Sequence, residues 1–106
     1  MFLDECVDRR LARHLPGHDV STAHSRRWTG LPDALLLQRC LGEIDVFVTV
    51  DANPRYQQDL SRLDFGIVVL RSPESGLAGL VLAAPALLAA IAEVGPGRVL
   101  EVNPPR

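Results

Sequence analysis

The chain has 106 residues, of which 47% are hydrophobic and 23% are charged. This length fits one hydrophobic core, so we expect a single domain over residues 1–106, and the composition excludes an intrinsically disordered chain. The net charge of -2 gives no global attraction to nucleic acid or to an acidic membrane, so such a partner would need a local patch.

The cysteines and the apolar segments indicate a cytoplasmic protein without a membrane span. Cys6 and Cys40 are too far apart for a C-x-x-C motif, so we expect free thiols, and the start lacks the pattern of a signal peptide. The longest apolar run, residues 77–92, is interrupted by Gly79 and Pro85 and is shorter than the roughly 20 residues that cross a bilayer. We expect a buried helix there.

The first half of the chain predicts two strands and two helices. Residues 1–4 form a short buried strand, and a helix follows from Cys6. The apolar residues of this helix recur at every fourth position: Val7, Leu11 and Leu15. Residues 18–23 can form a second strand, and residues 24–31 have the composition of a loop. A second helix begins near Pro32 and ends at Gly42.

The second half continues the alternation. The strongest strand signal, VFVTV, lies in residues 45–51, and a short helix opens at Asn53 and Pro54. Residues 65–71 form a buried strand, a long Ala/Leu helix is kinked or split at Pro85, and residues 98–102 form a last strand. The whole pattern predicts a three-layer α/β domain with a mainly parallel sheet of about five strands, flanked by helices.

Two of the predicted strands end on acidic residues. Asp4 and Glu5 end the first strand, and Asp51 ends the third. Ligand sites of open α/β sheets lie at the carboxyl ends of the strands, and adjacent strands are ~4.8 Å apart. A single Asp at such a junction is often only a helix cap, but a group of like charges usually persists where a cation binds. We therefore predict a metal site centred on Asp4 and Asp51.

The candidate ligands all carry oxygen, with no His or Cys at ligand spacing, which favours Mg²⁺ or Mn²⁺. Such ions typically act on phosphates. Asp33 is a further candidate carboxylate at a helix start, where complementation of the helix dipole explains it equally well. Asn53 can offer a carbonyl oxygen or cap the next helix, and capping is the favoured interpretation.

A basic segment around residues 24–28 combines positive charge with a stacking surface, which suits single-stranded nucleic acid. Such a loop is also commonly just solvated, and its tryptophan can dock on the core. The candidate substrate contacts are Arg9, Arg13, Arg26, Arg27 and Trp28.

Several segments together resemble a known family. They are FLDEC-x-x-x-R-x-A from Phe2, GHDV from Gly17, G-L-x-D-x-L-L from Gly30, V-x-V-T-x-D from Val46 and G-I-V-V-L-R from Gly66. In this order and spacing they resemble the small PIN-like proteins related to the VapC-type toxins. The resemblance implies a PIN-like fold and a Mg²⁺- or Mn²⁺-dependent endoribonuclease, often the toxin of a toxin–antitoxin pair. It also implies RNA as substrate, an antitoxin protein as partner and a homodimer through the apolar helix of residues 77–93.

The resemblance also assigns the acidic residues. Asp4 corresponds to the first acid of the family and Glu5 to its acidic neighbour, while Asp33 is the helix acid and Asp51 the acid that closes the central strand. Relatives commonly read T-x-D-x-D-F after that strand, whereas this chain has Asn53 in place of the second Asp. The exchange removes a negative charge from the implied site.

Two other functions compete with the nuclease. A catalytically silent PIN-like module that only binds RNA or protein is suggested by Asn53. A phosphoacceptor receiver domain would also place an acidic pair after its first strand and an Asp after its third. Receiver domains use a Lys after the fifth strand, and all eleven basic residues here are Arg, which counts against this class.

Overall fold

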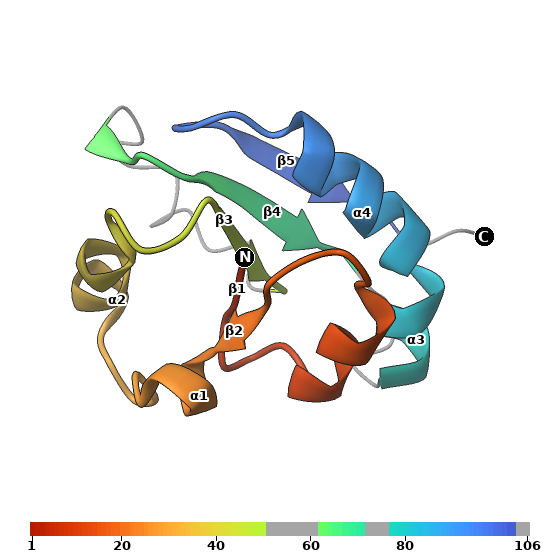
Figure 1. Ribbon diagram of the computed structural model, residues 1–106, viewed down its shortest axis with the longest axis horizontal. Coiled ribbons are helices and arrows are strands. Elements are labelled where there is room, and N and C mark those ends of the chain that lie inside the picture. Colours follow the sequence, from red (N-terminus) through yellow and green to blue (C-terminus); the bar gives the residue numbers. More distant parts are fainter. Residues whose placement is uncertain (51–61, 72–76, 104–106) are drawn as a thin grey trace.

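The computed structural model describes residues 1–50, 62–71 and 77–103, which fold around a five-stranded sheet (Figure 1). The strand order is β2-β1-β3-β4-β5, and every neighbouring pair is parallel. The strands are β1 (Phe2–Leu3), β2 (Ser21–Thr22), β3 (Val46–Thr49), β4 (Gly66–Leu70) and β5 (Val99–Val102). The predicted three-layer α/β architecture with a mainly parallel sheet is confirmed.

The central strands β3 and β4 are buried at every position. Successive side chains of a strand point to opposite faces of the sheet, so each strand contributes to two hydrophobic cores. Val46 and Val48 belong to the first core, whereas Phe47 lies in the second. This burial on both faces explains why the apolar runs carry no polar alternation.

The first core lies against η1 (Arg9–His14), α3 (Leu77–Leu82) and α4 (Ala84–Glu93) (Figure 1). The helix predicted from Cys6 is shorter than expected and is a 3₁₀ helix, but its apolar residues are buried: Val7, Leu11 and Leu15. The predicted split of the Ala/Leu helix is confirmed, because α4 begins with Pro85 in its first turn, where no backbone N–H partner is required. No helix in the described ranges is long and apolar enough to cross a membrane.

The second core lies against α1 (Ala23–Arg26) and α2 (Asp33–Cys40). The prediction of a loop over residues 24–31 was wrong for residues 24–26, which belong to α1. A capping box begins this helix, since Thr22 Oγ1 accepts from the Ser25 backbone N–H at 3.0 Å and Ser25 Oγ accepts from the Thr22 N–H at 2.8 Å. The helix therefore replaces the end of the predicted strand 18–23. The helix predicted after Asn53 lies outside the described residues.

The two leucines of α3 provide a test of this packing. Leu80 is 2% exposed in the first core, whereas Leu82 on the same helix is 64% exposed. Leu80→Ala should lower the free energy of unfolding by about 2–5 kcal/mol, because it leaves a cavity, and Leu82→Ala by less than about 0.5 kcal/mol. Urea denaturation followed by circular dichroism measures both. Equal losses would contradict the packing of α3 described above.

Candidate functional site

The site lies where the strand order reverses. β1 has β2 on one side and β3 on the other, which makes the β1–β3 junction the switch point of the sheet. The register pairs Leu3 with Val48, so Asp4 and Thr49 follow side by side at the carboxyl edge. The condition for the predicted site, that the first and third strands are neighbours, is met.

Among the described residues, Thr49, Cys6 and Glu5 donate to the Asp4 carboxylate at this edge. Asp4 is only 6% exposed. Asp4 Oδ2 accepts from Thr49 Oγ1 at 2.9 Å and from Cys6 Sγ at 3.4 Å, and Oδ1 accepts from the Glu5 N–H at 2.9 Å. These bonds offset part of the cost of burying a charge. Asp4 is not the cap of the following helix, because Asp8 accepts from the Arg10 N–H at the start of η1.

Cys6 is a member of this cluster that the sequence did not reveal. Its Sγ lies 3.3 Å from Thr49 Oγ1 as well as 3.4 Å from Asp4 Oδ2. Desolvation by burial raises the pKa of the Cys6 thiol despite the opposing hydrogen bond with Thr49, so the thiol is protonated at neutral pH. The other cysteine, Cys40, lies in the second core, where burial raises its pKa to about 12. Both cysteines are free, as predicted.

Glu5 is exposed and faces the loop that leads into α2. Both of its carboxylate oxygens accept from the Gly30 N–H at 3.3 Å. Gly30 has a φ of 77°, a left-handed conformation that glycine adopts without strain. Glu5 thus ties the entry of α2 to the end of β1, next to the Asp4 cluster.

The remaining candidate ligands are only partly described. Asp33 is the first residue of α2, but its side chain is not described, and Asp51 and Asn53 lie outside the described residues. Within the described ranges, no group of three or more His, Cys, Asp or Glu side chains could hold a metal. The full ligand set therefore stays a prediction, and the structure brings together Asp4, Cys6 and Thr49.

The basic residues are divided between two regions. Arg9 and Arg13 are exposed on η1, which follows the Asp4 turn. Between them, Arg10 pairs with Asp8 at 2.7 Å, and its hydrogen bonds lower the pKa of Asp8 to about 2. Arg27 is exposed at the end of α1 with a φ of 60°. Arg9, Arg13 and Arg27 are therefore accessible to a ligand.

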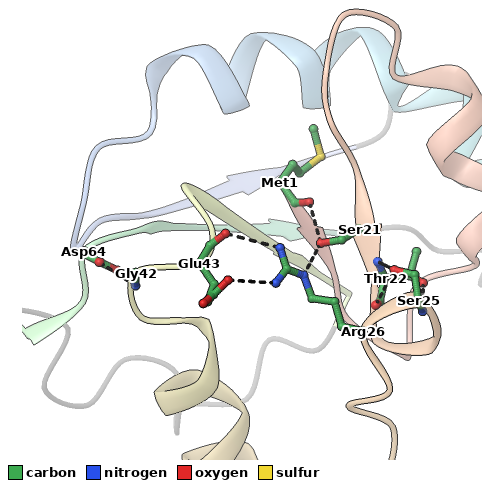
Figure 2. Close-up of polar contacts among 8 residues, drawn as sticks. All are labelled: Met1, Ser21, Thr22, Ser25, Arg26, Gly42, Glu43 and Asp64. Atoms are coloured by element: carbon green, nitrogen blue, oxygen red, sulfur yellow. Dashed lines mark hydrogen bonds and ion pairs between the residues drawn. The ribbon is translucent and has the colours of Figure 1, made fainter.

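Arg26 and Trp28 are engaged within the fold. The Trp28 ring packs on the second core, with its centroid 5.6 Å from that of Phe2. The Arg26 guanidinium lies 4.9 Å from the Trp28 ring centroid, a cation–π contact. Arg26 also donates to Ser21 Oγ at 2.7 Å and to Glu43 Oε2 at 3.5 Å (Figure 2). This placement agrees with the interpretation in which the tryptophan docks on the core.

A polar cleft of about 610 Å³ opens beside Arg26. Met1, Asp19, Asp45 and Asp64, which precede strands β1 to β4, line it, so it lies at the amino edge of the sheet, opposite to Asp4. Its groups also contact one another, since the Gly42 N–H donates to Asp64 Oδ2 at 2.8 Å (Figure 2). The sequence did not predict this cleft, because its residues are scattered along the chain.

Comparisons of the chain with protein-family models, with curated proteins and with solved structures find no match in any of the three. The PIN-like resemblance thus stays a prediction from short motifs. The functional argument below depends mainly on the geometry around Asp4.

The bond between Thr49 and Asp4 can be tested by an isosteric change. Thr49→Val keeps the shape but removes the hydroxyl donor, so it should lower the free energy of unfolding by about 1–3 kcal/mol. Thr29→Val makes the same change at an exposed position and should alter it by less than about 0.5 kcal/mol. Urea denaturation at pH 7 compares the two. If both variants were as stable as the wild type, the bond would not be what holds Asp4.

Proposed function

We propose that the protein is a Mg²⁺- or Mn²⁺-dependent ribonuclease of the PIN-like type. The observation that carries the proposal is that Asp4, a residue only 6% exposed, has its carboxylate hydrogen-bonded at the β1–β3 switch point. Burying a carboxylate costs free energy even when it is hydrogen-bonded. A purely structural junction could hold an uncharged residue at the same place.

The donors present fit a hard cation in their chemistry. Asp4 and Glu5 offer carboxylate oxygens at the end of β1, the ligand type that Mg²⁺ and Mn²⁺ take. Asp51 follows the last residue of β3 by two positions, and Asp33 begins α2. We propose both as further ligands, with Asn53 as a carbonyl donor. A bound ion would activate a water and stabilise charge on a phosphodiester.

Arginine side chains of the protein would bind the RNA substrate. Since the chain has no Lys, contacts to phosphate would come from Arg, whose guanidinium can bind two phosphate oxygens at once. Arg9 and Arg13 are the best placed, because they are exposed on the helix that follows Asp4. From the family resemblance we further propose that the protein acts as a toxin, binds an antitoxin protein and forms a homodimer.

A silent binding module is the second candidate, and Asn53 favours it because a carboxamide brings no charge to the ion. Calorimetric titration with Mn²⁺ separates the two functions. Binding that vanishes in an Asp4→Asn variant would count against the silent module, and absence of binding to the wild type would favour it.

The receiver class shares one feature with this fold, the strand order 2-1-3-4-5 of flavodoxin-like sheets. The chain nevertheless lacks the Lys that receivers use to contact the phosphoryl group. Incubation with a small phosphodonor should therefore leave Asp51 unlabelled, and labelling detected by mass spectrometry would support this class instead.

Cleavage of single-stranded RNA in the presence of Mn²⁺ tests the nuclease. Asp4→Asn should reduce the rate by about 100-fold, since it removes a charged ligand at nearly constant shape. Asp64→Asn, the same change at the amino edge, should stay within about twofold of the wild type, and a chelator should abolish cleavage. Equal rates for the wild type and Asp4→Asn, or no cleavage by the wild type, would refute the assignment.

A further inference from the structure

We propose that Cys6 is a positioning residue for Asp4. The Cys6 thiol donates a hydrogen bond to Asp4 Oδ2 and so fixes the plane of the carboxylate. The role of Asp4 as a ligand rests on the proposed function, whereas the hydrogen bond itself does not. Cys6 would act through Asp4 and would not itself be a ligand.

The hydrogen bond between Cys6 and Asp4 runs from the thiol to the carboxylate. Asp4 Oδ2, Thr49 Oγ1 and Cys6 Sγ form a closed triangle with sides of 2.9, 3.4 and 3.3 Å. The Thr49 hydroxyl carries a single proton, which it donates to Asp4. The thiol donates its proton in the contact between Sγ and Asp4 Oδ2, whereas either atom can be the donor in the contact between Sγ and Thr49 Oγ1. Asp4 Oδ2 thus accepts hydrogen bonds from both Thr49 and Cys6.

The backbone places the thiol where it can act. Cys6 lies in the turn after β1, and this turn is closed by the Val7 N–H, which donates to the Asp4 carbonyl oxygen at 2.9 Å. The residue is exposed as a whole, although its sulfur faces Asp4 and Thr49. Replacing Cys6 therefore removes a donor without opening a cavity in either core.

A thiol is suited to this task because it is a weak donor. It can orient Oδ2 while withdrawing less electron density from it than a second hydroxyl would, which leaves Asp4 an effective ligand for a hard cation. Hydrogen bonds that orient ligands in this way typically change metal affinity by about 10–100-fold, and a thiol should lie at the low end.

Metal affinity gives the first test. In calorimetric titrations with Mn²⁺, Cys6→Ala should bind about tenfold more weakly than the wild type, whereas Cys6→Ser, which keeps a donor, should stay within about threefold. An unchanged affinity in Cys6→Ala would overturn the proposal. An equal loss in both variants would also overturn it, since it would mean that the sulfur is itself a ligand.

Infrared spectroscopy of the metal-free protein gives a second test that does not depend on the proposed function. The S–H stretch of Cys6 should move to higher frequency in Asp4→Asn, because a neutral acceptor binds the thiol proton less strongly. The S–H band of Cys40, buried in the second core, serves as an internal reference and should not move. If the wild type bound no Mn²⁺, the proposed function would fail, but a shifted Cys6 band would still establish the contact. An unshifted Cys6 band would refute it.

Discussion

Parallel pairing between β1 and β3 holds the start of the chain against its middle, and the Thr49–Asp4 bond closes that pairing at its carboxyl end. β1 has only two residues, yet it pairs with β2 and β3 at once. Its side chains Phe2 and Leu3 are fully buried in opposite cores. The position of Asp4 is therefore fixed by packing on both faces of the sheet, so the core and the candidate site cannot vary independently.

Acidic residues differ in exposure and in hydrogen bonding between the two edges of the sheet. At the amino edge, Asp45 and Asp64 stay exposed. Asp45 forms an ion pair with the N-terminal ammonium of Met1, and Asp64 accepts from the Gly42 N–H. At the carboxyl edge, Asp4 is buried and needs donors from Thr49, Cys6 and the backbone of Glu5. A buried carboxylate departs from the usual placement of charged residues at the surface, and such departures are expected at functional sites rather than at purely structural positions. The contrast is the main physical reason for placing function at the carboxyl edge.

The sequence predicted correctly those elements that are determined by residues close to one another along the chain. The VFVTV run and Pro85 located β3 and the start of α4 because burial and the missing proline donor act at the residue itself. The prediction of a loop at residues 24–26 was wrong, because the capping box between Thr22 and Ser25 begins a helix there. Cys6 was missed for a different reason. Its contact with Thr49 spans 43 positions and exists only once β1 and β3 pair, so no spacing rule encodes it.

For the basic residues too, contacts made in the folded chain differ from what the local sequence indicates. These contacts limit the direction from which a nucleic acid would approach. Sequence composition grouped Arg26 with Arg27, but the Arg26 guanidinium is engaged by Ser21, Glu43 and the Trp28 ring. Removing it from these contacts would cost the fold hydrogen bonds and a cation–π contact. Arg9 and Arg13 are exposed, make no such contacts with the residues that the structure describes, and follow Asp4 along the chain. If the nuclease proposal holds, the phosphate backbone would therefore cross the sheet edge from the side of η1, whereas Arg26 and Trp28 stabilise the fold.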